Sequence, residues 1–341
     1  MTIGIIDVGT NSIHLVIGLL GLNGKFHVIL KERDLTRLGE GGLAKGALTP
    51  QAMSRALTVL RRYAAILERC RVDHVEAVAT SAVREARNGR AFVRRVRARL
   101  GLPLRIISGR QEARLIYLGV LRAHRLQRPT VIIAIGGGSA QVMCGNGVRL
   151  AYAASLPLGG ARLAQQFIRH DPPTAQEVAA LTAHLRRAWR PVARAVRRHR
   201  WRQALGSSAT LQQLLLAAYV QDHRRLPKKK QGLTISQRSL RRLLDWLAVS
   251  TARERIQLPG LDPRREDLAL TTGLALLTWM EHCGISRLRY ATGSLREGLV
   301  IEYLLRHHQR IRRIENPLMD LIGTNGTTLP RMLRLPAALA R

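Results

Sequence analysis

Two glycine-rich turns of similar composition stand far apart in the chain. The first is Asp7-Val8-Gly9-Thr10-Asn11-Ser12, and the second is Gly136-Gly137-Gly138-Ser139. Because a run of apolar residues stands on both sides of each turn, the pattern predicts two β-hairpins with glycine and hydroxyl residues at their tips. Such tips present clustered backbone N–H groups and hydroxyls, which suit a phosphate oxygen. We therefore expect a duplicated phosphate clamp.

The acid that precedes the first turn has no counterpart before the second. Asp7 ends the first apolar run, whereas the matching position in the second is Ala134. A carboxylate at the end of a buried strand can hold Mg²⁺ or its waters, and Gly9 lets the backbone approach a phosphate closely. Taken alone, the first turn is equally compatible with an ordinary hairpin capped by Asn11 and Ser12.

A third segment, residues 79–86, places an arginine where a strand runs into a helix. The sequence Ala-Thr-Ser-Ala-Val-Arg-Glu-Ala puts Arg84 in the first helical turn. An arginine there can bind a phosphate with two parallel hydrogen bonds, and the helix N-terminus favours the same anion. The alternative is a surface ion pair between Arg84 and Glu32 or Asp34.

A fourth segment places a carboxylate at the carboxyl end of a strand. Glu112 lies in the first turn of a helix predicted to begin at Ser108 and Gly109. A carboxylate at this edge of an α/β sheet can act as a general base on water. It is also the acid expected in the first turn of any helix that a serine caps, and the spacing does not separate the two roles.

Alternating strand and helix patterns predict two α/β domains that hold these four segments. We place the first domain at residues 1–124, the second at 125–315 and a C-terminal tail at 316–341. The second half repeats the opening strands and is then mostly helical. We expect a kink or break at Pro191 in its arginine-rich helix, and a buried helix at residues 268–280.

Composition restricts the compartment and the partner. The formal charge of +34 favours polyanionic partners, although a general bias toward arginine would give the same charge. Three isolated cysteines argue against a disulfide framework or a structural zinc site. We expect a cytoplasmic protein with no signal peptide and no membrane span, since no apolar run approaches about 20 residues.

In this order, the segments resemble the exopolyphosphatase and guanosine pentaphosphate phosphohydrolase family. The segments that match are 7–12, 79–86, 108–113, 136–139, 155–159, 206–210 and 295–298. The resemblance implies the actin-like ATPase fold, with two ribonuclease-H-like domains and an active site in the cleft between them. It also implies Mg²⁺-assisted attack of water on the terminal phosphoryl group of polyphosphate, or on the 5′ phosphate of guanosine pentaphosphate.

The resemblance assigns roles to particular residues. Glu112 matches the catalytic base, Asp7 matches the acid of the first phosphate motif, and both are the expected metal ligands. Arg84 matches an arginine that faces the cleft. The residues that match the phosphate-binding loops are Gly9, Thr10, Asn11 and Ser12 in the first turn, and Gly137, Gly138 and Ser139 in the second.

The chain departs from the family in its second loop. Ala134 and Gln141 stand where the family has acids, Ala140 replaces a hydroxyl residue, and Gln111 stands where many members have a second Glu. The loss of two carboxylates weakens a Mg²⁺ site and makes the cleft more attractive to polyanions.

Two functions therefore stay open at this point. One is a phosphohydrolase that uses Mg²⁺, and the other is a non-catalytic sensor of polyphosphate or a guanosine alarmone. Nucleic-acid binding through the arginine-rich second domain rests on charge alone, and a homodimer is a further expectation.

Overall fold

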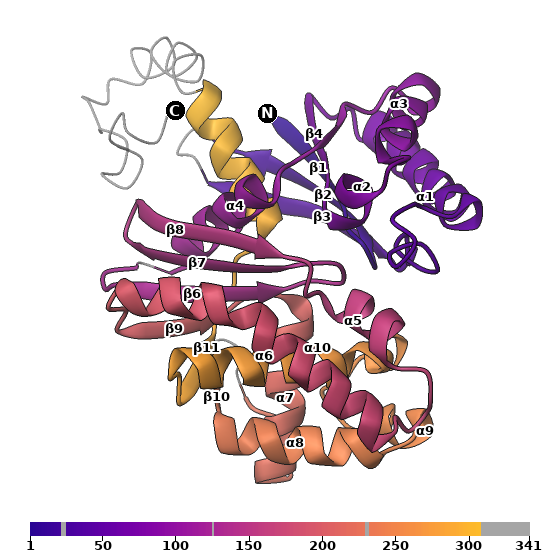
Figure 1. The fold of residues 1–341 in the computed structure, drawn as a ribbon. Coiled ribbons are helices and arrows are strands. Elements are labelled where there is room, and N and C mark those ends of the chain that lie inside the picture. The colour runs from indigo at the N-terminus through magenta and orange to yellow at the C-terminus, as the bar shows by residue number, and fades with distance from the viewer. Residues whose placement is uncertain (22–24, 125, 229–231, 308–341) are drawn as a thin grey trace.

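The computed structural model describes residues 1–21, 25–124, 126–228 and 232–307, and its strands form two sheets (Figure 1). The first is five-stranded, in the order β3-β2-β1-β4-β5, and the second is six-stranded, in the order β10-β11-β9-β6-β7-β8. The two sheets carry the two predicted hairpins, β1–β2 and β6–β7.

The first half of the chain alternates strands and helices. Thr49 caps α1 by accepting a hydrogen bond from the Ala52 N–H, and Pro50 occupies its first turn. The elements are β1 (Thr2–Val8), β2 (Ile13–Leu20), β3 (Phe26–Asp34), α1 (Pro50–Arg69), β4 (His74–Ala79), α2 (Ser81–Glu85), α3 (Gly89–Leu100), β5 (Leu104–Ile106) and α4 (Gly109–Ala123).

The second half begins with three antiparallel strands and then adds helices. Its elements are β6 (Thr130–Ile135), β7 (Ala140–Asn146), β8 (Arg149–Leu156), α5 (Gly160–Phe167), α6 (Ala175–Arg198), β9 (Gln203–Gly206), α7 (Ala209–His223), β10 (Thr234–Ser236), α8 (Gln237–Val249), α9 (Ala252–Arg255), the 3₁₀ helix η1 (Pro263–Leu268), α10 (Ala269–Cys283) and β11 (Arg287–Tyr290). A last helix covers residues 295–307.

The two sheets repeat one topology, which confirms the predicted duplication of the opening strands. In each sheet a strand pairs antiparallel with the next strand along the chain and parallel with a later one: β1 with β2 and β4, and β6 with β7 and β9. The hairpin tips close in the same way, because the Gly9 N–H donates to the Ser12 carbonyl at 3.0 Å and the Gly136 N–H to the Ser139 carbonyl at 2.9 Å.

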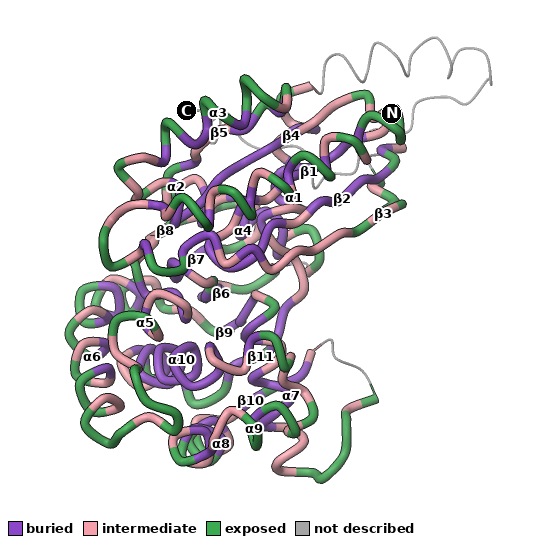
Figure 2. Tube along the Cα trace, turned by 90° about the vertical axis from the view of Figure 1, so that its right-hand side faces the viewer, coloured by how far each residue is buried: buried purple, intermediate pink, exposed green. Residues whose placement is uncertain are grey.

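One apolar core joins the two sheets. It contains Ile3 and Val78 of the first sheet, Ile132 and Met143 of the second, and buried residues of α4 and of helix 295–307. The helix 295–307 thus returns to the first sheet, beside which Figure 1 shows it. In Figure 2, the buried residues run through the strands of both sheets and through α10, as predicted for residues 268–280.

The predicted break at Pro191 is wrong, because α6 runs without interruption from Ala175 to Arg198. Pro191 lies on the exposed side of α6, while its neighbours Trp189 and Val192 are buried in the core of the second sheet. That packing holds the helix together across the missing hydrogen bond. The predicted tail, residues 316–341, lies outside the described residues.

None of the helices that the structure describes is both long enough and apolar enough to span a bilayer.

Candidate active site

The two hairpin tips face one another across a cavity of about 180 Å³. Both tips, the start of α4 and several later turns contribute to its wall. The expected site residues that line the cavity are Asp7, Gly9, Thr10, Asn11, Ser12, Glu112, Gly137, Gly138 and Ser139. The fold thus brings together residues that are more than 100 positions apart in the sequence.

The tips lie in direct contact with each other. A Cβ atom added to Gly138 would lie 2.3 Å from Thr10 Oγ1 and 2.6 Å from Ser81 Oγ. A Cβ on Gly159, in the turn before α5, would lie 2.4 Å from the backbone of Gly137 and Gly138. Only a residue without a side chain fits such spacing, so Gly138 allows the two tips to approach each other, and Gly159 allows the turn before α5 to pack against the second tip.

Glu112 is the central carboxylate of the site. Ser108 caps α4 by accepting from the Gln111 N–H, so the first turn of this helix holds Glu112 at the cavity wall with 8% of its surface exposed. Burial raises the pKa of Glu112 to about 7, although the adjacent Arg84 guanidinium opposes the shift. A carboxyl group that titrates near neutral pH is suited to general-base catalysis.

Arg84 contacts Glu112 instead of lining the cavity. Its Nη1 donates to Glu112 Oε2 at 2.8 Å and to the Ile107 carbonyl at 3.3 Å. The alternative of a surface pair with Glu32 or Asp34 is wrong, because those acids pair with Arg62 of α1. In this structure Arg84 orients the carboxylate, and its expected contact with phosphate stays a prediction.

The first hairpin carries an acid–histidine pair where the second carries alanine and glutamine. The β-ladders place Asp7 opposite His14, and Ala134 opposite Gln141. Burial raises the pKa of Asp7, while the positive charge of Arg296 opposes that shift. Burial, together with Arg296, Arg265 and Arg33, lowers the pKa of His14 to about 2, so its imidazole is neutral.

Several cavity residues come from later parts of the chain. Segments 206–210 and 295–298, which the sequence already singled out, contribute Ser207, Ser208, Thr210 and Arg296, and Ser294 lies directly before the second segment. His14 and Arg265 also line the cavity and were not expected. His14 faces Asp7 across the predicted hairpin, so its pairing could have been found, whereas Arg265 resembles any other arginine of this arginine-rich chain.

The donor set of the cavity does not fit a resident Mg²⁺ ion. Mg²⁺ requires oxygen ligands in near-octahedral geometry, and carboxylates supply them most often. Ala134 has no ligand atom, and Gln141 offers only a neutral amide oxygen, while its amide nitrogen donates to Ser139 at 2.8 Å and Ser155 at 3.0 Å. In the part of the chain that the structure describes, no group of three or more His, Cys, Asp or Glu could hold a metal. Asp7 and Glu112 alone support the expected ion.

The fold and the cavity define a class of protein: a two-domain α/β protein of the actin-like ATPase fold, with a cavity between its two hairpin tips. Residues 21–307 match the Ppx/GppA phosphatase family, so the chain belongs to that family of phosphohydrolases.

Solved structures agree with the assignment. The exopolyphosphatase from Cytophaga hutchinsonii is 30% identical, with a TM-score of 0.80 over 89% of this chain and 97% of that one. The Aquifex aeolicus member of the Ppx/GppA family is 26% identical, with a TM-score of 0.73 over 90% of this chain and 98% of that one. Both similarities extend over the two domains that form the cavity.

Proposed function

We propose that the chain removes the terminal phosphate from polyphosphate or guanosine pentaphosphate, with Glu112 as the general base. The observation that carries the proposal is the position of Glu112: a buried carboxyl with a pKa of about 7, in the wall of a cavity that both hairpin tips line. The similarity to an exopolyphosphatase supports polyphosphate as the substrate class. The charge of +34 is consistent with a polyanion.

The proposed reaction is a phosphoryl transfer to water. The water oxygen forms a bond to the terminal phosphorus while its proton passes to Glu112. The bridging P–O bond breaks, and the shortened phosphate chain leaves with the electron pair. The backbone N–H groups and hydroxyls of the two tips bind the non-bridging oxygens, and Arg296 at the cavity wall stabilises the charge that develops.

In the metal-assisted form of this reaction, Mg²⁺ would neutralise charge on the phosphate oxygens. Asp7 and Glu112 are the residues of this chain that would hold it. Because the donor set does not fit a resident ion, we assign no step to the metal.

A second candidate function is a non-catalytic sensor of polyphosphate or of a guanosine alarmone. The composition of the second hairpin favours it: Ala134 and Gln141 leave the tip able to bind phosphate but without an acid. A sensor would keep the binding geometry of both tips and would not release phosphate.

Phosphate release from polyphosphate distinguishes the two functions. The assay compares the wild-type chain, Glu112→Gln and the control Gln111→Ala, each with Mg²⁺, with Mn²⁺ and with a chelator. We expect Glu112→Gln to lower the rate by about 10³-fold, as is typical when a general base is lost. The control should keep the wild-type rate. A wild-type chain that binds polyphosphate tightly but releases no phosphate in any buffer would establish the sensor instead.

A further inference from the structure

Arg265 is a buried cation that forms no ion pair with any carboxylate of the described residues, although the charge of Asp262 raises its pKa. It lies in η1, has 7% of its surface exposed and lines the cavity. Its Nη2 donates to Ser12 Oγ in the first hairpin tip, while its Nε has no hydrogen-bond partner. Among the described residues, no carboxylate oxygen lies within 4.0 Å of its guanidinium nitrogens, although many other arginines of the chain form such pairs.

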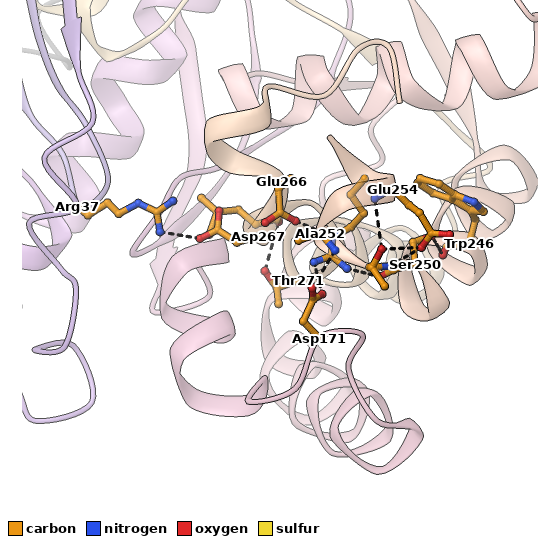
Figure 3. A network of polar contacts seen from close by, with 12 residues as sticks. Arg37, Asp171, Trp246, Ser250, Ala252, Glu254, Glu266, Asp267 and Thr271 are labelled. Carbon is orange, nitrogen blue, oxygen red and sulfur yellow. Dashed lines mark hydrogen bonds and ion pairs between the residues drawn. The ribbon is translucent and has the colours of Figure 1, made fainter. Parts of the chain in front are cut away.

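The carboxylates nearest to Arg265 in the sequence bind other arginines. Asp262 accepts from Arg33 at 2.9 Å and from Arg264 at 3.3 Å. Glu266 accepts from Arg255 at 2.6 Å, and Asp267 accepts from Arg37 at 2.9 Å. Figure 3 shows Asp267 turned toward Arg37. Asp262, Glu266 and Asp267 therefore pair with arginines other than Arg265, and among the described residues none of them forms an ion pair with Arg265.

A buried guanidinium without a counter-ion is unfavourable until an anion binds beside it. Neighbouring arginines affect the pKa of two buried groups in the cavity, Arg265 and His14. Burial, with Arg33 as the next cause, lowers the pKa of Arg265 to about 10. Burial and the arginines around His14 lower its pKa to about 2. Arginines thus come next after burial among the causes of both shifts, so positive charge gathers on this side of the cavity.

The opposite wall of the cavity adds no acid that could attract a cation. Ala134 is apolar, and Gln141 donates from its amide nitrogen to two serine hydroxyls. Glu112 already pairs with Arg84 at 2.8 Å. A metal ion would therefore enter a cavity that is lined by two arginines, Arg265 and Arg296, as well as by the acids Asp7 and Glu112.

The geometry points to direct, metal-independent binding of a phosphate chain in this cleft, with Arg265 as its principal charged contact. The inference rests on the proposed function for the substrate class, and it adds that this chain binds the substrate without the metal. The planar guanidinium can hold two phosphate oxygens, and its free Nε–H offers a donor that Ser12 does not use.

Calorimetric titration with tripolyphosphate tests the inference, once with Mg²⁺ and once with EDTA. We expect the wild-type chain to bind with an unchanged Kd in the two buffers. Arg265→Gln should weaken binding by about 10- to 100-fold in both, the usual loss for a hydrogen bond to a charged group. Arg264→Gln is the matched control: it removes the same charge one residue away, from a side chain that is 68% exposed, and should bind like the wild type.

A second variant keeps the inference testable if Arg265→Gln does not fold. The double change Ala134→Asp and Gln141→Glu restores two acids to the second tip, so it should weaken binding in EDTA and make it recover with Mg²⁺. Binding by the wild type only when Mg²⁺ is present would overturn the inference. An Arg265→Gln chain that folds and binds tripolyphosphate as tightly as Arg264→Gln would also overturn it. The same holds for a double variant whose Kd for tripolyphosphate is equal with Mg²⁺ and with EDTA.

The same titrations separate this inference from the proposed function. Tight binding in EDTA without phosphate release would leave the metal-independent site intact and remove the hydrolase. Phosphate release and binding that both require Mg²⁺ would support the hydrolase and remove the metal-independent site.

Discussion

The two hairpin tips share their backbone and differ in their side chains. Each tip closes with a hydrogen bond from a glycine N–H to a serine carbonyl, Gly9 to Ser12 and Gly136 to Ser139. Each also lies at the same place in the strand order of its sheet. At the paired positions behind the tips, however, the first hairpin has Asp7 opposite His14, and the second has Ala134 opposite Gln141.

This difference separates phosphate binding from catalysis. Phosphate binding uses backbone N–H groups and small residues, which the second hairpin has kept. Proton transfer and metal binding need carboxylates, and the described residues supply them only from the first half of the chain, at Asp7 and Glu112. The second hairpin is thus expected to contribute to the affinity for phosphate, and the first half of the chain to contribute the groups that transfer protons or bind a metal.

The largest effect is expected in the pH dependence of kcat/KM, which tests whether the first half of the chain supplies the catalytic carboxylate. Burial raises the pKa of Glu112 to about 7, so the carboxyl group is mostly protonated below pH 7. Only the ionised carboxylate can accept a proton from the attacking water. We expect the rate to fall about tenfold per pH unit well below 7, and about 50-fold between pH 7, where half of the carboxyl groups are ionised, and pH 5. A steady-state phosphate-release assay across this range measures it.

Unfolding does not explain such a loss. An acid with a raised pKa binds its proton more tightly in the folded chain, so this group destabilises the fold as pH rises from 4.5 toward 7 and not as it falls. A midpoint near 4.5, or a profile that is flat from pH 6 to 8, would show that the base lies elsewhere.

Arg84→Gln should have the next largest effect. The Arg84 guanidinium lowers the pKa of Glu112, so its removal should move the midpoint of the rate profile upward by about one unit. At pH 7 the rate should then fall about fivefold and recover in more alkaline buffer. Arg84→Lys keeps the charge and should shift the midpoint less. A uniform loss at every pH would instead indicate that Arg84 binds the phosphate itself.

The contact between the tips gives the smallest predicted effect. A Cβ on Gly138 would lie 2.3 Å from Thr10 Oγ1, whereas a Cβ on Gly136 would lie 3.5 Å from the Ser139 carbonyl, an ordinary contact. Gly138→Ala should lower the free energy of unfolding by about 1 kcal/mol, because short hydroxyl side chains must shift to accommodate the methyl group. Gly136→Ala should change it little.

Chemical denaturation of the two alanine variants measures this difference. Equal stabilities would mean that the two tips do not close on one another as the structure shows.

Local pattern was sufficient for most of the fold and for part of the site. Apolar runs on both sides of glycine predicted β1–β2 and β6–β7, and caps such as Thr49 and Ser108 predicted the starts of α1 and α4. Glu112 could be named as a candidate base because a strand, a cap and an acid follow one another within a few residues. The break expected at Pro191 failed because burial of Trp189 and Val192 outweighed the missing hydrogen bond.

The sequence by itself determined the two glycine tips, the missing acids at Ala134 and Gln141, and the family to which these motifs lead. Each is a matter of residue identity within a short segment. The tertiary structure alone decided which charges meet in the cavity. Arg265 reaches Ser12 across 253 positions, and the acids beside it in sequence bind other arginines. Electrostatic interactions depend on distance in space and on burial, and neither can be read from the order of residues along a chain.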